Sequence, residues 1–284
     1  MRIANKQVQG RTVLSKRNNW TKQILPLTII VIGIFFMLTQ LVTNLDIYLK
    51  AQLTKVQYPP SYDFALYKHL LEKFVHEGLV NYKVLAQTKE LDSAVDELAS
   101  ISPEHFADNN QKLAFWINTY NLLILKNVVN HYPMKERSSF IRDLSLRKFV
   151  IGGQSIATDD IRTGKIQPLI SSGDPRPIFL ICGGALGYPR LISHPISLET
   201  LESDMNEATN EFVNRKNNVV YEPRTGTLYI SQFFKWNVSL FVGSPFEFVN
   251  QHLPKARQVD FDDFHTKTSY LGLFDWTLNE GHAQ

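Results

Sequence analysis

The chain contains one cysteine, Cys182, whose thiolate form would be a nucleophile. It opens the segment Cys182-Gly-Gly-Ala-Leu-Gly-Tyr-Pro-Arg190, here called the glycine loop, and ends an apolar run, residues 177–182, that predicts a buried strand. The glycines let backbone N–H groups approach an anion or a carbonyl, but the P-loop lysine and a strand–GxGxxG–helix arrangement are missing. A thiolate needs a nearby base or cation, and no histidine is close in sequence. We therefore expect Cys182 to be a small buried apolar residue rather than a nucleophile.

Two amides, Asn118 and Asn121, lie three residues apart within a strongly apolar segment. On a helix this spacing places them on one face. They could form the polar wall of a ligand pocket. Alternatively they could form a satisfied network that fixes the helix to a neighbouring loop, because an unpaired buried amide costs about 1–3 kcal/mol. The second interpretation is preferred.

A pair of carboxylates, Asp159 and Asp160, precedes a helix predicted to begin near Ile161. One of them as N-cap needs no further function, and this interpretation is preferred. A catalytic carboxylate pair or a cation site is the alternative, although adjacent side chains at a helix start diverge.

Two further pairs combine a charge with an indole, Lys235-Trp236 and Asp275-Trp276, and for these we expect core packing with a hydrogen-bonded indole N–H. The eight histidines show no metal-ligand spacing, and HExxH, CxxC and GxSxG are all missing from the sequence. The sequence therefore predicts neither a metal site nor a cofactor.

The elements that would position these residues follow from periodicity and turn signals. Helices are predicted at residues 62–77, 88–100, 111–131, 197–214, 233–241 and 246–253, hairpins at 148–157 and 219–230, and strands at 177–182 and 271–278. Residues 111–131 are apolar nearly all round, which indicates a buried central helix. Helices come first and strands cluster later, so the predicted fold is α+β, with a helical N-terminal half followed by a mainly antiparallel sheet and flanking helices.

The N-terminal part predicts a membrane anchor. Residues 23–45 carry no charged side chain. A segment of this length is long enough, as a helix, to cross about 30 Å of hydrocarbon. A polar stripe, as in a core helix, and an A-x-A-like exit, as in a signal peptide, are both missing. Six basic side chains precede the span, against Lys50 and Lys55 after it, so the N-terminus should stay in the cytoplasm. In a Gram-negative cell the rest would lie in the periplasm, held at the inner membrane.

This organisation also explains the charge of +3. The predicted parts are a basic cytoplasmic tail (1–22), a transmembrane helix (23–45), a stalk (46–60) and a globular domain (61–280). Because the tail contains six basic and no acidic residues, the remainder carries −3. We therefore expect a lipid bilayer as a partner through residues 23–45 and no nucleic acid.

Six stretches in order resemble the bacterial family called domain of unknown function number 547, across roughly residues 62–280. They are Val80-Asn-Tyr-Lys-Val-Leu, Leu113-Ala-Phe-Trp-Ile-Asn-Thr-Tyr-Asn121, Ile151-Gly-Gly-Gln-Ser-Ile-Ala-Thr-Asp-Asp-Ile161, Asp174-Pro-Arg176, Ser231-Gln-Phe-Phe-Lys-Trp236 and Phe274-Asp-Trp-Thr-Leu-Asn279. The resemblance implies a fold and a family, but no known reaction.

The departures from the family pattern concern its reactive groups. Members usually carry a histidine after the Asp-Asp-Ile element, and an Asn-Cys followed by a Cys-Pro downstream of Asp-Pro-Arg. Aligned without gaps, the histidine position is Thr163, the asparagine is Cys182, and the two cysteines are Gly183 and Tyr188. If the family uses thiol and imidazole catalysis, this chain has lost both groups.

The sequence thus favours a membrane-anchored extracytoplasmic module of the cell envelope that is non-catalytic or catalytically degenerate and binds a peptide, an envelope component or a protein. The alternative is a hydrolase or transferase with Cys182, Asp160, Asn118 and Asn121 around the glycine loop. The candidate binding residues are Trp116, Asn118, Asn121, Asp159, Asp160, Arg176, Gly183, Gly184, Tyr188, Lys235, Trp236 and Asp275.

Overall fold

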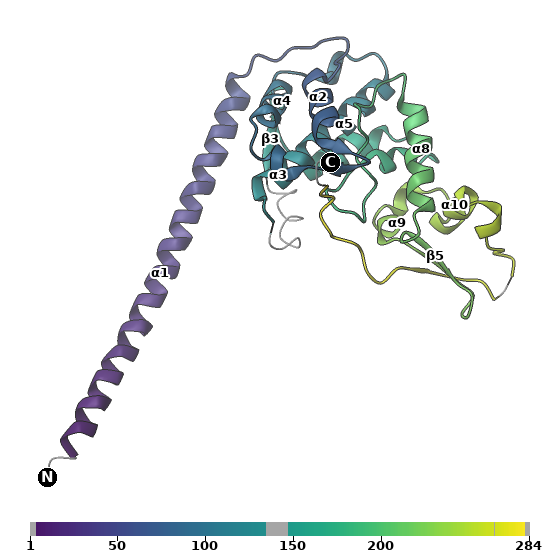
Figure 1. Cartoon of the computed structure of the whole chain (residues 1–284). Helices are drawn as coiled ribbons and strands as arrows, with labels where there is room; N and C mark the ends of the chain where they lie inside the picture. The colour runs from purple at the N-terminus through teal and green to yellow at the C-terminus, as the bar shows by residue number, and fades with distance from the viewer. Residues whose placement is uncertain (1–3, 135–146, 264, 282–284) are drawn as a thin grey trace. The chain divides into compact units, whose positions relative to one another are not determined.

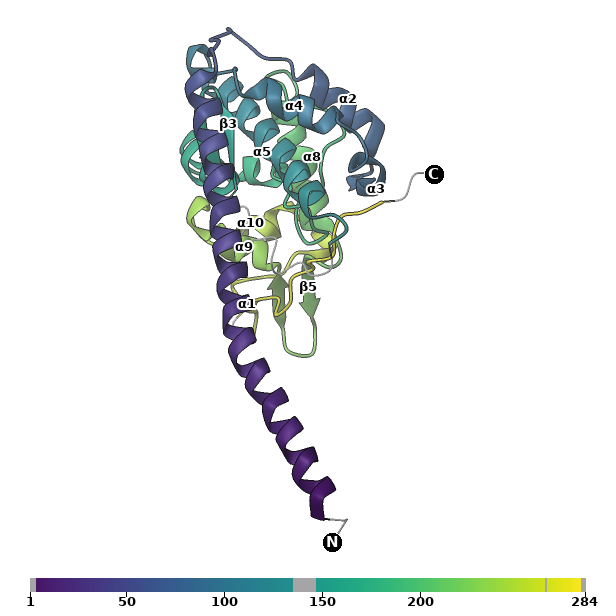
Figure 2. The same ribbon diagram turned by 90° about the vertical axis from the view of Figure 1, so that its left-hand side faces the viewer.

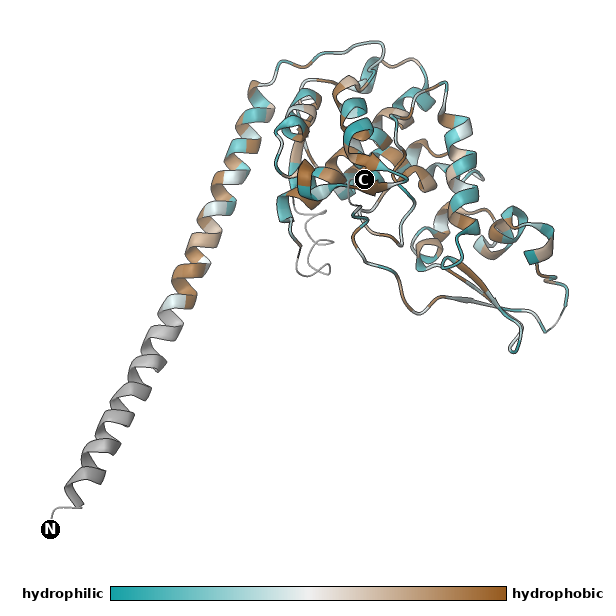
Figure 3. Ribbon diagram, viewed as in Figure 1, coloured by the Kyte–Doolittle hydropathy of each residue, from teal (hydrophilic) through white to brown (hydrophobic). Residues whose placement is uncertain are grey.

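The computed structural model describes residues 4–134, 147–263 and 265–281, and it divides into two compact units, Met1–Gln52 and Leu53–Gln284. The first unit is formed by helix α1 (Ala4–Leu53), whose segment Thr28–Leu53 is long and apolar enough to cross a membrane (Figures 1 and 3). Its apolar side chains are open, with Phe35 68% and Met37 73% exposed. Such a surface is unfavourable in water and is stabilised by an apolar surrounding.

The stretch predicted as a stalk is helical up to Leu53. Beyond it, Gln57 pairs with residues 100–102 through the bonds Gln57 N to Ser100 O (2.7 Å) and Ser102 N to Gln57 O (3.0 Å). Gln57 and its partners all belong to the second unit, so these bonds lie within that unit.

Helices dominate the first half of the second unit. Its elements are α2 (Ala65–Phe74), β1 (Val75–His76), β2 (Leu79–Val80), α3 (Tyr82–Leu85), α4 (Glu90–Leu98), a 3₁₀ turn (Pro103–His105) and α5 (Asn109–His131). The helix predicted at 62–77 is shorter than expected. Its last residues form β1, because Glu77 and Gly78 both take positive φ (50° and 79°), as a tight hairpin turn requires.

Helix α5 is the buried central helix that the sequence predicted. The Asp108 side chain caps it by accepting from Asn110 N at 2.6 Å, and it ends before Pro133. Side chains around its whole circumference are buried, from Leu113 to Val128. Polar residues on this helix therefore face protein and must find partners within it.

The middle of the chain begins with the predicted hairpin. Strands β3 (Lys148–Ile151) and β4 (Gln154–Ala157) are antiparallel and joined by Gly152-Gly153, both at positive φ. Next come α7 (Thr158–Ile161), a π-helical turn (Arg162–Ile166) and a 3₁₀ turn (Gln167–Leu169). The predicted N-cap role of Asp159 or Asp160 is wrong, because both lie inside α7 and the cap position is Ala157.

The strand predicted at residues 177–182 is also wrong. Residues Arg176–Leu180 form a 3₁₀ helix, and only Ile181 continues in an extended conformation. A short apolar run fits a buried helical turn as well as a strand, and here Pro175 and Pro177 flank its start. The segment remains buried as expected.

The last part contains α8 (Leu201–Asn214), β5 (Val219–Glu222), β6 (Thr227–Ile230), α9 (Gln232–Trp236), a 3₁₀ turn (Val238–Leu240), α10 (Pro245–His252), a 3₁₀ turn (Lys255–Arg257) and β7 (Lys267–Tyr270). The sheet order is β5-β6-β7, with β6 and β7 parallel. The β5–β6 hairpin projects from the end of the unit where α9 and α10 lie (Figures 1 and 2). The strand predicted at 271–278 is wrong: β7 ends at Tyr270, and the residues after it form an isolated β-bridge, Ala185 to Leu278, and several backbone hydrogen bonds with the glycine loop.

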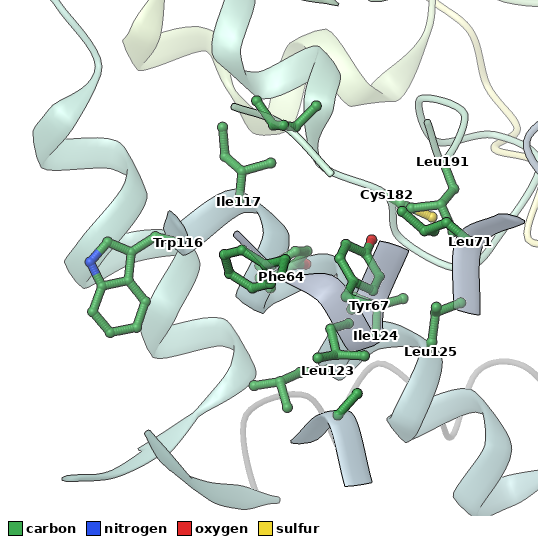
Figure 4. Packing of buried hydrophobic residues seen from close by; sticks show 14 of the residues in the cluster. Phe64, Tyr67, Leu71, Trp116, Ile117, Leu123, Ile124, Leu125, Cys182 and Leu191 are labelled. Carbon is green, nitrogen blue, oxygen red and sulfur yellow. The ribbon is translucent and has the colours of Figure 1, made fainter. Parts of the chain in front are cut away.

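Two apolar clusters form the core. The larger gathers α2, α4 and α5 and includes Cys182 (Figure 4). The second is ring-rich and lies around Phe179, Phe212 and Phe234. The strands are distributed over three small sheets of two, two and three strands among the described residues. The fold class is α+β, as predicted.

Candidate functional site

The thiol of Cys182 is sealed in the larger core. Cys182 is 1% exposed and lies near Leu71 and Leu191 (Figure 4). Burial raises its pKa to about 11, although the Gly184 N–H and the Asn279 amide favour the thiolate. A thiol with this pKa is almost fully protonated at neutral pH, so its position gives it no nucleophilic character.

The amide of Asn121 holds the start of the glycine loop. Its Nδ2 donates to Leu180 O at 2.8 Å, and its Oδ1 accepts from Cys182 N at 2.9 Å. These two bonds give the extended segment around Ile181 the partners that a neighbouring strand would have supplied. One side chain of the central helix thus replaces a strand in the place where the sequence predicted one.

Asn118 repeats this arrangement one turn earlier. Its Nδ2 donates to Ile196 O at 2.8 Å, and its Oδ1 accepts from Ile196 N at 2.9 Å. The two amides thus fix α5 to two loops, which is the network preferred from the sequence. Both amides are nearly sealed, so neither is accessible to a ligand.

A residue that the sequence did not single out, Asn279, completes the surroundings of the sulfur. Its Oδ1 accepts from Tyr82 Oη at 2.9 Å, and its Nδ2 donates to Gly78 O at 3.2 Å and to Cys182 Sγ at 3.8 Å. Gly184 N also donates to Sγ, at 3.4 Å. The only sequence signal for Asn279 was its place at the end of a family-like stretch.

The glycine loop folds back on itself at Gly183 and Tyr188. A Cβ on Gly183 would lie 2.3 Å from Cγ and Cδ2 of Tyr188, so the tyrosine ring rests directly on the Gly183 backbone. Burial raises the pKa of Tyr188 to about 12, and the charge of Arg162 opposes this shift. Position 183 therefore requires glycine, because any side chain there would overlap the ring of Tyr188.

Three other aromatic side chains pack near the ring of Tyr188. Its ring lies 5.0 Å from Phe274, 6.2 Å from Trp236 and 6.0 Å from Trp276, measured between centroids. The expected core packing is wrong for Trp236, which is 46% exposed at the end of α9. Two family-like stretches from distant parts of the chain thus meet here, beside the glycine loop.

An open cleft of about 640 Å³ adjoins these rings. Its walls include the turn at Glu77 and Gly78, the glycine loop, Asn217 and Asn218 just before β5, and residues of the segment 271–275. Two carboxylates and two guanidinium groups line it, namely Glu77, Asp275, Arg190 and Arg215. Both arginines also pair with Glu211, at 3.1 Å for Arg190 and 2.6 Å for Arg215, so the cleft carries no strong excess of positive charge.

The remaining candidates lie apart from the sulfur. Asp159 pairs with Arg162 at 2.8 Å, while Asp160 is exposed. Arg176 binds Asp174 at 2.7 Å and Glu202 at 2.6 Å, which fixes its segment to α8. Trp116 is 8% exposed, with the Lys165 ammonium 5.4 Å from its ring.

The last two candidates, Lys235 and Asp275, are both exposed. Asp275 lines the cleft, and its Oδ1 accepts from Thr277 N at 2.8 Å. In the described part of the chain, no group of three or more His, Cys, Asp or Glu side chains could hold a metal ion.

A central stretch of the chain is similar to a protein family. Residues 104–213 match the model of the family described as "Protein of unknown function, DUF547". The match confirms the resemblance over these residues, which include α5, the Asp159-Asp160 pair and the glycine loop. No curated protein and no solved structure matches the chain.

Proposed function

We propose that this protein is a single-pass protein of the inner membrane whose C-terminal unit lies in the periplasm and is a non-catalytic binding module of the cell envelope. One observation carries the proposal. The cleft of about 640 Å³ is open, whereas the sole cysteine beside it is sealed and the nearby amides are bonded to backbone groups. The geometry thus offers space for a ligand without a nucleophilic thiol directed at it.

The character of the cleft supports a polar, uncharged ligand. Its charged side chains are balanced, and both arginines have Glu211 as a partner. Neutral polar side chains supply the rest of its polar lining, including Asn217, Asn218 and Ser231. A phosphate-rich ligand would need unpaired cations, which the described walls do not provide.

A turnover and alkylation experiment tests the absence of catalysis. The full chain in lipid nanodiscs should hydrolyse or transfer no ester, amide or thioester substrate faster than its Cys182→Ser variant. Because burial raises the thiol pKa to about 11, iodoacetamide at pH 8 should label Cys182 at least about a hundredfold more slowly in the native protein than in urea.

The matched control is Cys182→Ser combined with Leu186→Cys, which places the thiol at a 38% exposed position of the same loop and should react rapidly. Turnover that one substitution in the cleft abolishes would refute the proposal. Rapid native labelling of Cys182 would do so as well, since it would restore the nucleophile.

The membrane arrangement is tested in cells. The six basic residues before the span and the two soon after it favour a cytoplasmic N-terminus. Protease added to spheroplasts should therefore digest a C-terminal tag and spare an N-terminal one, and both should be digested after lysis. Protection of the C-terminal tag, or recovery of the protein in the soluble fraction, would contradict this part of the proposal.

A further inference from the structure

The rings next to the glycine loop form one continuous surface, here called the aromatic platform and consisting of Tyr188, Trp236, Phe274 and Trp276. The two indoles are stacked, with centroids 5.7 Å apart and an angle of 29° between their planes. Phe274 lies 4.7 Å from Trp236 and 4.6 Å from Trp276. Three separate segments of the chain therefore contribute to the same apolar surface.

This surface is open to solvent. Trp236 is 46% exposed, and Phe274 and Trp276 are partly exposed. Buried indoles usually find an acceptor for their N–H group. In the described structure, neither indole N–H has a protein acceptor and neither is among the sealed unsatisfied atoms. The Trp276 donor is thus available to a ligand, and the Trp236 donor has no protein acceptor in the described structure.

The platform is held rigidly. Gly187 N donates to Asp275 O at 2.8 Å and Leu186 N to Thr277 O at 2.7 Å, which joins the glycine loop to the C-terminal segment. Arg215 donates to the carbonyl groups of Leu186 (2.9 Å) and Tyr188 (3.0 Å). Binding of a ligand here therefore loses little free energy to ordering of protein side chains and loops.

The distances between the rings restrict the shape of the ligand. All centroid separations within the platform lie between 4.6 and 6.2 Å, so the rings touch one another and leave no space between them. A cation cage, in which rings surround an ammonium group, is therefore excluded. The ligand must place a flat apolar face on the outer side of the rings.

The cleft specifies what the rest of the ligand must be. Phe274 and Tyr188 belong both to the platform and to the cleft wall, so a ligand on the rings extends into the cleft. There it meets the exposed amide of Asn217 and the Oδ1 of Asn218, which has no protein donor in the described part of the chain. A sugar ring has the required combination of an apolar C–H face and a rim of hydroxyl groups.

We infer that the aromatic platform and the cleft bind a neutral oligosaccharide, with one sugar ring stacked on the exposed indole of Trp236 and further hydroxyl groups bonded in the cleft. This rests on the proposed binding function and adds its ligand class. Nucleotides fit less well, because their phosphates would meet balanced charges, and the chain beyond residue 22 has a net charge of −3.

The inference is tested by calorimetry on the full chain in nanodiscs, with chitotetraose, cellotetraose and maltotetraose as probes. At least one should bind, and Trp236→Ala should weaken that binding by about tenfold or more, because it removes the stacking face. Trp236→Phe, which keeps a ring, should recover part of the affinity. The matched control Tyr221→Ala, at an aromatic residue of similar exposure (44%) that does not line the cleft, should bind as the wild type does.

Each other result has a defined meaning. If none of the three probes binds, or if Trp236→Ala binds as well as the wild type, the inference is wrong. If a proline-rich peptide binds instead, and its binding depends on Trp236, the ligand class inferred here is wrong. The proposed binding function would remain valid. Cleavage of a bound oligosaccharide would instead refute the non-catalytic function and keep the ligand class.

Discussion

Replacing Asn121 by alanine should lower the free energy of unfolding by about 3–5 kcal/mol, because the change leaves two buried backbone groups without a partner. These groups are the carbonyl of Leu180 and the N–H of Cys182, which bind the amide at 2.8 and 2.9 Å. The segment around them has no strand beside it in the described structure, so the backbone of a sheet cannot replace the amide. Urea unfolding of the full chain, followed by tryptophan fluorescence, measures the loss.

The control for this experiment lies on the same helix. Asn130 is exposed near the end of α5, and Asn130→Ala should change the stability by no more than about 0.5 kcal/mol. Asn118→Ala should resemble Asn121→Ala, since Asn118 binds both backbone groups of Ile196. If Asn121→Ala were as mild as Asn130→Ala, the amides would not be structural, and their role as a ligand wall would have to be reconsidered.

The elements that the sequence predicted well depend on local signals. Helix α5 is apolar nearly all round, and α8 has one apolar face, so periodicity alone located both. The β3–β4 hairpin followed from Gly152-Gly153, whose positive φ values suit a two-residue turn. None of these features requires knowledge of distant residues.

The two strand predictions that were wrong depend on distant partners. Residues 176–180 are apolar enough for a strand, but their neighbour is the Asn121 side chain, 59 residues from Leu180. Strand β7, Lys267–Tyr270, shows little apolar alternation and exists because it pairs in parallel with β6, 40 residues earlier. Sequence periodicity contains no information about either partner.

The candidate site was predicted in part for the same reason. The burial of Cys182 followed from the apolar run before it and from the lack of a nearby base. The two charge–indole pairs were noticed, but their meeting at the aromatic platform joins residues 236 and 276, and this contact depends on the tertiary fold. Individual residue types could therefore be recognised, whereas their common surface could not.

The second large effect is expected at Gly183, which should not tolerate even alanine. The added Cβ would lie 2.3 Å from Cγ of Tyr188, far inside van der Waals contact. The ring cannot move away freely, because it packs against Phe233, Phe274 and both indoles. Gly183→Ala should therefore cost about 2–4 kcal/mol, while Gly164→Ala, where a Cβ meets nothing within 4 Å, should cost less than about 1 kcal/mol.

The cause can be isolated with a double-mutant cycle in urea unfolding. Tyr188→Ala should itself destabilise the protein, but Gly183→Ala added to it should cost little, which gives a coupling of about 1–3 kcal/mol. Additive effects would show that the ring is not the obstacle at position 183.

The same geometry predicts that cysteines placed at positions 183 and 188 can form a disulfide. Because Cβ of Tyr188 is one bond of about 1.5 Å from Cγ, Cβ atoms at positions 183 and 188 can be no more than about 3.8 Å apart. This lies within the range of about 3.5–4.5 Å found in disulfides. Gly183→Cys combined with Tyr188→Cys, in a Cys182→Ala background, should form a disulfide on oxidation, seen as a loss of two free thiols and 2 Da in mass.

Positions 183 and 188 are then coupled by packing. A tyrosine at 188 permits only glycine at 183, and a side chain at 183 excludes the ring that supports the aromatic platform. If the paired cysteines stayed reduced under conditions that oxidise an accessible dithiol, the two positions would not be adjacent. The packing assigned to the glycine loop would then be wrong, along with the platform built on it.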